Sequence, residues 1–419
     1  MARTFENHIV ESVRTRLSAF NPLNLYRDRL YRNSLFIILA SIAGSCLGLL
    51  FWVIAAHYYS IGDIGLASTL ISTSSLISTV AGLGLDQAMI RYFPSRDKSR
   101  IFGTALQANL LFSVVLGVVF VLGASIWMPD LVTDPSYRIL FVVLTCVMSV
   151  SGIISTSFIG SRMAKYVLIM TLLLGLRVPL LIPFVPLGSM GVLASLVLVY
   201  VLMFGVCAIF LYRMGIRLGK FDWAYFKESF WFSTGNYVGN ILYSLPTLVS
   251  PIIIYSMIGS SEAAIYYMSL SVTAIVFYVP SSFSTSLFVE GSHGESLGKI
   301  FKKSLMVIYA ILIPLVLLII CLGPWILGIL GEEYAAQGPI ILDLLVISSL
   351  FLAPYLAEST ALKIRGKVRG LIILSAINAI SFFALLLALV SLYGMDGIGM
   401  AWIGSFAICT VVGYVMVRD

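Results

Sequence analysis

The amino-acid sequence predicts an all-α integral membrane protein with about 12 transmembrane helices. Of its 419 residues, 60% are hydrophobic and only 11% are charged, and the mean hydropathy is +1.03. Soluble domains carry about 25% charged residues, so this composition excludes that class. The apolar runs are about 20 residues long, the length at which a helix crosses about 30 Å of hydrocarbon. Runs this long and continuous are helices, since lipid allows only helices and closed barrels.

The apolar runs divide into two sets of six. The expected spans are 34–57, 64–90, 101–127, 139–161, 166–186, 190–212, 230–257, 263–288, 304–330, 339–361, 370–392 and 396–417. We expect a first six-helix lobe over 34–212, a cytoplasmic linker over 213–229 and a second six-helix lobe over 230–419.

A cytoplasmic amphipathic arm is expected over residues 1–33, ahead of the first span. Apolar residues recur there every four positions, at Phe5, Ile9, Val13 and Leu17. That spacing places them on one face of a helix, which we expect to lie on the membrane surface. A disordered tail is the alternative interpretation.

Positive charge is confined to one side of the predicted membrane. Of the 26 Lys and Arg, all but Arg138 and Arg177 lie in the arm, in alternate loops or at the C-terminus. Cytoplasmic loops carry the excess of positive charge in membrane proteins. We therefore expect a multi-pass protein of the cytoplasmic (plasma) membrane with both termini in the cytoplasm. These loops also account for the net charge of +7, so the charge does not indicate nucleic-acid binding.

An internal repeat relates the two sets of spans. Asp63 and Glu262 each open the second helix of a set, and Arg100 and Lys299 each open the third. Both pairs are 199 residues apart (262 − 63 and 299 − 100). Because six is an even number, the halves cross the membrane in the same orientation. This predicts a pseudo-twofold axis along the membrane normal and a central cavity, an arrangement found in transporters.

The sequence lacks the patterns of most enzymes and cofactor sites. It contains no GxxxxGK[ST] phosphate loop. The three histidines, His8, His57 and His293, are far apart, and all five cysteines fall inside apolar runs, so neither a metal cluster nor a disulfide framework is indicated. We expect no cofactor, no metal and no catalytic residue.

Arg177 is the one cation predicted inside a span. It lies about eleven residues into the fifth span, which is about 16 Å of helix and so near the bilayer midplane. Arginine stays protonated, and its planar fork suits phosphate or carboxylate. It is a candidate contact for an anionic head group in the cavity. In the alternative, structural interpretation, Arg177 bonds to carbonyls that Pro179 and Pro183 leave free.

Several other charged residues are candidates for gating or ion coupling. Asp86 lies near the cytoplasmic end of the second span, where it either pairs with a nearby base or binds a coupling ion. Asp343, in the tenth span, is a candidate proton or sodium site or an acid near the outer interface. Arg91 and Glu290 are candidate gate charges at the cytoplasmic side. Glu358 is expected to be solvated or paired with a local Lys or Arg.

Hydroxyl and amide side chains concentrate in the second, seventh and eighth spans and are sparse in the third, sixth and ninth. Many would bond back to their own helix. Their unequal distribution nevertheless indicates that these three helices line a wet cavity. The candidate sugar-binding residues are Asn236, Asn240, Tyr243, Thr247 and Tyr278, with the tyrosine rings as apolar platforms.

Several motifs resemble those of a known transporter family. They are Arg32-Asn33-Ser34, Ile61-Gly62-Asp63-Ile64-Gly65-Leu66-Ala67, Gly82-Leu83-Gly84-Leu85 with Ile90-Arg91-Tyr92-Phe93-Pro94, and Phe232-Ser233-Thr234-Gly235. With the span layout, they resemble the polysaccharide biosynthesis, or oligosaccharide flippase, branch of the multidrug/oligosaccharidyl-lipid/polysaccharide exporter superfamily. The resemblance implies two six-helix lobes around a central cavity. Some relatives carry cations in the cavity helices of the second half, but the seventh and eighth spans here carry none, which leaves Arg177 as the main anion-binding candidate.

The resemblance implies a flippase that translocates a lipid-linked oligosaccharide by alternating access. The hydroxyl-rich cavity would take the sugars and Arg177 the phosphate, while the lipid tail would stay in the bilayer through a lateral gap. The expected partners are a polyprenyl-linked oligosaccharide and membrane lipid. Further candidates are H⁺ or Na⁺ and a polysaccharide polymerase or glycosyltransferases. The alternatives are an ion-coupled multidrug or small-solute exporter, with Asp343 or Asp86 as the ion site, and a membrane glycosyl- or acyltransferase.

Overall fold

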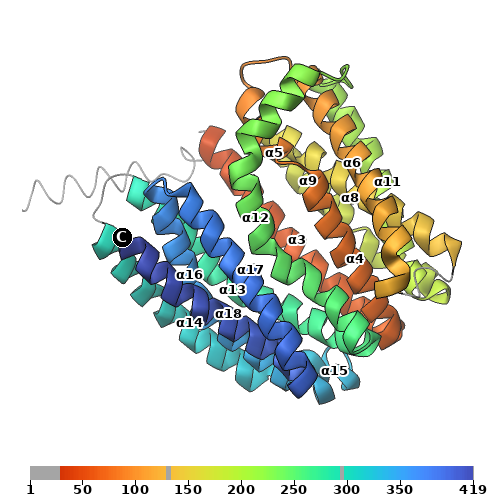
Figure 1. The fold of residues 1–419 in the computed structure, drawn as a ribbon. Helices are drawn as coiled ribbons and strands as arrows, with labels where there is room; N and C mark the ends of the chain where they lie inside the picture. Colours follow the sequence, from red (N-terminus) through yellow and green to blue (C-terminus); the bar gives the residue numbers. More distant parts are fainter. Residues whose placement is uncertain (1–28, 129–133, 293–296, 419) are drawn as a thin grey trace, which may run out of the picture.

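The helices of the chain form two groups that meet at one end and diverge toward the other (Figure 1). The computed structural model describes residues 29–128, 134–292 and 297–418, so most of the expected N-terminal arm lies outside the described residues. The first group consists of α3 (Arg29–Tyr58), α4 (Ile61–Ala81), α5 (Leu85–Tyr92), α6 (Lys98–Trp127), α8 (Pro135–Gly160), α9 (Lys165–Leu174), α10 (Arg177–Leu180), the 3₁₀ helix η1 (Ile182–Leu187) and α11 (Ser189–Arg213). The second consists of α12 (Trp223–Met257), α13 (Ser260–Ser292), α14 (Leu297–Gly328), α15 (Glu332–Gln337), α16 (Pro339–Ile364), α17 (Val368–Tyr393) and α18 (Asp396–Arg418).

Within the described residues, 11 helices are long and apolar enough to cross a membrane. They correspond to all the expected spans except the fifth, which is present as a broken helix. The predicted all-α membrane fold with about 12 spans is therefore confirmed. The seventh helix begins earlier than expected, at Trp223, because Asp222 caps it by accepting a hydrogen bond from Tyr225 N at 3.1 Å.

The internal repeat is visible in the helix boundaries. α4 and α13 begin 199 residues apart (260 − 61), and α8 and α16 begin 204 residues apart (339 − 135). Gly188 and Gly191 recur as Gly394 and Gly397, both 206 residues later (394 − 188 and 397 − 191). Gly188 and Gly394 have left-handed φ angles of 56° and 59°. A Cβ added at Gly191 or Gly397 would lie 2.1 or 2.3 Å from a main-chain oxygen. Both halves thus use the same glycine-dependent turn and close approach, while the predicted lobe boundaries stay a prediction.

The fifth expected span is not one helix but the three short pieces α9, α10 and η1. Pro179 and Pro183 donate no hydrogen bond and crowd the carbonyl four residues earlier. Gly175, just before them, weakens the helix further. The chain tightens here, and Gly175 O accepts from the N–H three residues later at 3.0 Å. The span expected over 166–186 is therefore present as a broken helix, interrupted at its prolines, and Arg177 begins α10 at the break.

The second expected span, 64–90, also divides. α4 ends at Ala81 and α5 begins at Leu85. Between them, Leu83 and Gly84 have φ angles of 50° and 70°. Left-handed residues end an α-helix, so the chain changes direction here. Asp86 and Arg91 consequently lie on a separate short helix, not in a membrane span.

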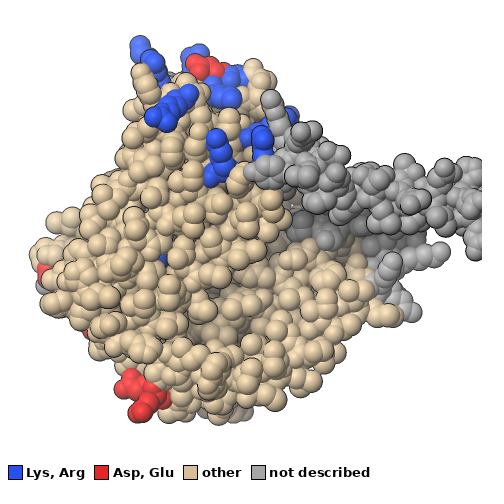
Figure 2. Space-filling view, turned by 180° about the vertical axis from the view of Figure 1, so that it is seen from behind, with Lys and Arg blue, Asp and Glu red and all other residues tan. Residues whose placement is uncertain are grey.

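Charge distinguishes two ends of the molecule (Figure 2). Lys and Arg gather at one end of the surface, here called the basic end, and Asp and Glu cluster at the opposite, acidic end. At the acidic end α4 and α13 touch, because a Cβ added at Gly65 would lie 1.8 Å from Ser260 O. Since these two helices are equivalent in the repeat, this contact joins the two groups at corresponding positions.

α12 is fastened to both groups. Near the basic end, Arg96 of the first group donates to both carboxylate oxygens of Glu228, at 2.8 and 2.9 Å. These hydrogen bonds hold the pKa of the Glu228 carboxyl below its usual value. Toward the acidic end, Ser250 Oγ and Tyr266 OH of α13 are hydrogen-bonded at 2.7 Å. α12 therefore follows the first group at one end and the second group at the other.

We expect Gly191→Ala to lower the thermal stability of the protein. The added methyl group would lie 2.1 Å from Phe184 O, a main-chain atom that moves only with η1. Overpacking of this kind costs about 1–3 kcal/mol. Gly205→Ala is the matched control in the same helix, because a Cβ there meets no atom within 4 Å. Equal melting temperatures for the two purified variants would contradict the close approach.

Candidate functional site: a cationic cavity between the helix groups

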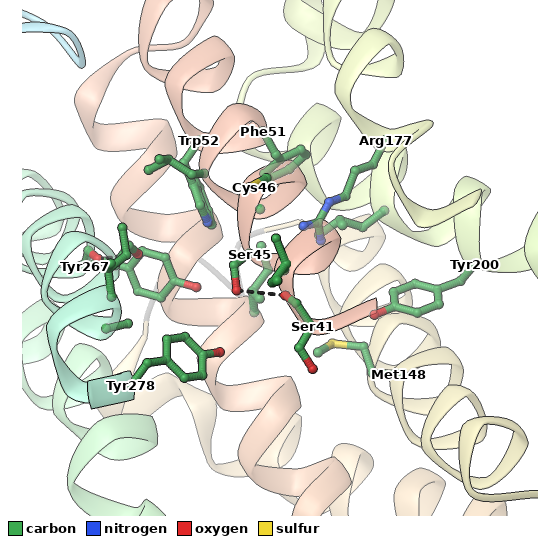
Figure 3. Close-up of a pocket in the computed structure, with 18 of the residues that line it drawn as sticks. Ser41, Ser45, Cys46, Phe51, Trp52, Met148, Arg177, Tyr200, Tyr267 and Tyr278 are labelled. Atoms are coloured by element: carbon green, nitrogen blue, oxygen red, sulfur yellow. Dashed lines mark hydrogen bonds between the residues drawn. The ribbon is translucent and has the colours of Figure 1, made fainter. Parts of the chain in front are cut away.

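A cavity of about 700 Å³ lies between the two groups of helices. α3 and α13 supply most of its wall, and α4, α8, α10 and α11 complete it (Figure 3). Its polar lining includes one arginine and several hydroxyl side chains, and no Asp or Glu of the described residues lines it. The cavity wall therefore carries net positive charge.

Arg177 supplies the charge of the cavity wall. Its guanidinium carbon lies 4.9 Å from the centroid of the Phe51 ring, a contact that stabilises a cation without neutralising it. Its Nε atom is buried without a hydrogen-bond partner. The ion pairs of the described residues do not include it. The structural alternative, in which the guanidinium bonds to carbonyls freed by prolines, is therefore not supported by any hydrogen bond among the described residues.

The segment around Arg177 is held by packing and one long-range hydrogen bond. Tyr59 OH donates to Leu181 O at 2.7 Å, which ties the end of α3 to the chain just after α10. A Cβ added at Gly48 of α3 would lie 3.4 Å from an Nη atom of Arg177. The glycine therefore leaves room for the guanidinium to lie against α3, at the edge of the cavity.

Hydroxyl groups surround the remaining space. Figure 3 shows the hydroxyls of Tyr200, Tyr267 and Tyr278 directed toward the same space as the Arg177 guanidinium. On α3, the Oγ atoms of Ser41 and Ser45 each donate a hydrogen bond to the main-chain oxygen four residues earlier, at 3.0 Å. Their oxygens keep lone pairs for a ligand. The site thus combines one cation with many hydrogen-bonding groups, which suits an anion attached to a hydroxyl-rich molecule.

The cavity reaches the outer surface of the bundle between α3 and α13. Ile42, Ile275 and Tyr278 line it, and each is at least half exposed, at 57%, 50% and 56%. Two of its aromatic lining residues, Trp52 of α3 and Tyr267 of α13, meet edge-on, with ring centroids 5.0 Å apart. The cavity therefore has an opening with apolar edges on the side of the molecule.

The structure separates the residues predicted to bind sugar. Tyr278 lines the cavity, whereas Asn240 and Tyr243 line a different crevice of about 230 Å³ among α12, α13, α16 and α17. Thr247 is exposed and lines neither space. The side chain of Asn236 lies outside the described side chains. A role in sugar binding stays a prediction for all five.

Three candidate gating and coupling residues, Asp86, Arg91 and Asp343, lie outside the cavity lining. Asp86 accepts a hydrogen bond from the neighbouring glutamine at 3.2 Å, and Arg91 lies 5.6 Å from the centroid of the adjacent tyrosine ring. Asp343 is partly buried in α16, and its Oδ1 has no hydrogen-bond partner. The Glu290 side chain lies outside the described side chains. Their roles stay predictions, and the described residues contain no group of metal-ligating side chains.

Glu358 differs from its sequence prediction. The sequence predicts a solvated or paired side chain, but Glu358 is only 2% exposed and forms no ion pair with a described residue. The reason is that this face of α16 packs directly against α18, where Gly413 approaches the carboxyl group.

The contribution of α3 to the cavity is absent from the sequence predictions, which place the cavity on the second, seventh and eighth spans. The available signal was the spacing of Ser41, Ser45 and Gly48. Residues three and four apart share one face of a helix, so these small side chains form a polar stripe in an otherwise apolar span.

Comparison with known proteins identifies the family. The model of the family described as "polysaccharide biosynthesis protein" matches residues 30–288. The chain is 24% identical over 197 residues to a putative O-antigen transporter of Shigella flexneri, a match that covers 45% of this chain and 47% of that protein. The matched region thus spans about half the length of this curated relative.

Solved structures share the fold at low sequence identity. An inward-facing MATE multidrug transporter of the MOP superfamily gives a TM-score of 0.72 at 13% identity and covers 91% of this chain and 97% of its own. The lipid II flippase MurJ, in an inward closed conformation, gives 0.71 at 16% identity, with 92% and 87% covered. The family resemblance predicted from the sequence is therefore confirmed. Since the family model matches more than half of its residues, this chain belongs to the polysaccharide biosynthesis protein family, on the fold of the MOP superfamily.

Proposed function

We propose that the protein is a flippase that moves a lipid-linked oligosaccharide across the cytoplasmic membrane by alternating access. The observation that carries this proposal is a cavity whose one charged lining residue, in the described part of the chain, is an arginine without a carboxylate partner there. An anion in the cavity would pair with Arg177, and a planar guanidinium bonds phosphate and carboxylate most strongly. The named relatives, an O-antigen transporter and a lipid II flippase, support the same substrate class.

The opening between α3 and α13 suits a substrate that has a polar head and an apolar tail. The phosphate would lie at Arg177 and the sugars against the tyrosine hydroxyls of α11 and α13. The tail would stay in the lipid, passing between Ile42 and Ile275. Removing an acyl chain from hydrocarbon costs about 0.8 kcal/mol per CH₂, so a side opening avoids a large penalty.

The basic end is proposed to face the cytoplasm, as the positive-inside rule favours. The groups meet at the acidic end and diverge toward the basic end, so this arrangement would be open to the cytoplasm. The TM-score is higher with an inward-facing transporter, at 0.72, than with an outward-facing one, at 0.62, which supports this assignment. Substrate would then enter from the cytoplasmic leaflet.

The two other candidate functions fit the cavity less well. An exporter of organic cations needs a carboxylate at its binding site, and Asp86 and Asp343 lie outside the cavity lining. A membrane transferase needs an acid–base pair, and His57 instead lies near the end of α3 with Nδ1 2.8 Å from Val53 O. We therefore propose transport without covalent change of the substrate.

We expect Arg177→Gln to reduce flipping of a fluorescent polyprenyl-diphosphate oligosaccharide in proteoliposomes by about tenfold or more. Hydrogen bonds to a charged group contribute about 1.5–3 kcal/mol, and about 1.4 kcal/mol corresponds to a factor of ten. Arg177→Lys keeps the charge but loses the planar fork, so its flipping rate should lie between those of the wild type and Arg177→Gln.

Arg213→Gln is the matched control, because this exposed arginine ends α11 outside the cavity. It should flip at the wild-type rate. If Arg177→Gln flips the substrate at the wild-type rate, the proposed anion site is contradicted, while the proposed transport function is not. Efflux of a quaternary ammonium dye, with no flipping by the wild type, would instead support the exporter.

We expect the lipid-linked substrate to protect Cys46 from a neutral, membrane-permeant maleimide. Cys46 lines the cavity, so a head group bound there would cover its thiol. Cys321 of α14 is also exposed but lies outside the cavity, and it provides an internal control. Mass spectrometry of the labelled peptides measures both sites at once. Equal protection of both thiols, or of neither, would place the substrate elsewhere.

A further inference from the structure

Glu358 is a carboxyl group buried inside the second helix group, apart from the cavity. It lies in α16, is 2% exposed, and its Oε2 is buried without a hydrogen-bond partner. The ion pairs of the described residues, Arg96 with Glu228 and Arg100 with Asp222, do not include it. It is therefore a buried acid without a compensating cation.

The facing helix is shaped to admit this carboxyl group. A Cβ added at Gly413 of α18 would lie 2.2 Å from Glu358 Oε2 and 3.1 Å from its Cβ. No residue but glycine leaves that space. The carboxyl group therefore lies directly against the main chain of α18, in a slot that one missing side chain creates.

Among the described residues, the titratable groups that interact with Glu358 come from two other helices and carry no positive charge. Tyr309 of α14 and Cys409 of α18 are within its electrostatic reach. Tyr309 OH donates to Leu350 O at 2.9 Å, and Cys409 Sγ lies 3.9 Å from Leu374 O. On α13, Ser284 Oγ is 2.5 Å from the Thr360 hydroxyl. These hydroxyl and thiol groups therefore make these hydrogen bonds to atoms other than the Glu358 carboxyl group.

Two of the described cations near the basic end of this group have other contacts, and a third lines a separate crevice. Arg365 donates to Val417 O, and the Arg418 guanidinium lies 4.5 Å from the centroid of the Tyr414 ring. Lys363 lines the crevice between α12 and α17. Among the described cations, none compensates a negative charge on Glu358.

The internal repeat shows what this contact contains without an acid. α8 and α16 correspond in the repeat. The prolines that open them, Pro135 and Pro339, are 204 residues apart (339 − 135). The left-handed residues that follow the two helices, at 162 and 366, are also 204 residues apart (366 − 162). With this spacing, Glu358 of α16 corresponds to Ile154 of α8. α11 and α18 correspond with a spacing of 206, so Gly413 of α18 corresponds to Cys207 of α11. Ile154 and Cys207 are buried, at 5% and 1% exposed. The first group thus has an apolar contact where the second has an acid facing a glycine.

An ionised carboxylate buried without a partner is so unfavourable that such a group takes up a proton instead. We propose that Glu358 is a proton-binding site, that its neutral form holds α16 against α18, and that release of the proton separates these helices. The proton would pass to water at the basic end, which α16 reaches six residues later, at about 9 Å along the helix. As a coupling site, Glu358 rests on the proposed transport function; as a proton site, it does not.

The site is tested first on purified protein, without transport. Melting temperatures of the wild type should fall as the buffer is made alkaline, because the folded packing excludes the ionised form. In Glu358→Gln and Glu358→Met, the melting temperature should fall less as the pH rises. The glutamine cannot ionise, and the methionine fits an apolar slot. Asp343→Asn, an equivalent change near the other end of α16, should keep the wild-type fall in melting temperature. Infrared difference spectra should show a protonated-carboxyl band in the wild type that both Glu358 variants lack.

The same variants then separate the two levels of the proposal. In proteoliposomes, an imposed pH gradient should change the wild-type flipping rate and leave that of Glu358→Gln unchanged. Identical melting curves and infrared bands in the wild type and the Glu358 variants would overturn the proton site. A Glu358 band without any flipping by the wild type would keep the proton site and overturn the transport function instead. A Glu358→Gln rate that still follows the gradient would overturn its role in coupling.

Discussion

The cavity depends on one half-buried cation, Arg177, that forms no ion pair among the described residues. Arg177 lies on the Phe51 ring, with a buried Nε that has no hydrogen-bond partner. Keeping an arginine in a membrane span is unfavourable, so such residues usually have a partner or face water. Here the guanidinium lines a cavity and forms no ion pair among the described residues, and its proposed partner is an anionic ligand. The broken helix, the glycine of α3 and the hydroxyl lining all serve to keep that position open.

Prolines and glycines place this cation. In a continuous fifth helix, the helical periodicity alone would decide on which face the side chain of residue 177 lies. Pro179 and Pro183 break the helix, and the hydrogen bond from Tyr59 to Leu181 fixes the broken segment against α3. Glycines then set how closely neighbouring helices approach, as Gly48 does beside Arg177 and Gly65 does beside Ser260. Small residues have this role in membranes because they let helices approach closely.

The two helix groups share a backbone design but differ in chemistry. The repeat conserves helix boundaries and glycine positions, because these determine how the chain turns and packs. Charged residues at the helix starts follow the repeat, as Asp63 and Glu262 do, but the interior charged groups Arg177 and Glu358 do not. Arg177 belongs to the first group and lines the cavity, whereas Glu358 belongs to the second and is buried away from it. Anion binding and proton binding, as proposed, would therefore reside in different halves and communicate through the helices that join them.

The sequence by itself determined the fold class, the number of spans and the repeat, and it singled out Arg177 as the one cation predicted inside a span. These follow from local properties: apolar run length, charge in loops and the energetic penalty of a cation in lipid. Only the tertiary structure decided which helices form the cavity, since α3 lines it while Asn240 and Tyr243 line another crevice. It also decided that Glu358 is buried without an ion-pair partner. Those properties depend on which helix faces which, and helical periodicity gives the face of a residue but not the neighbour that the face meets.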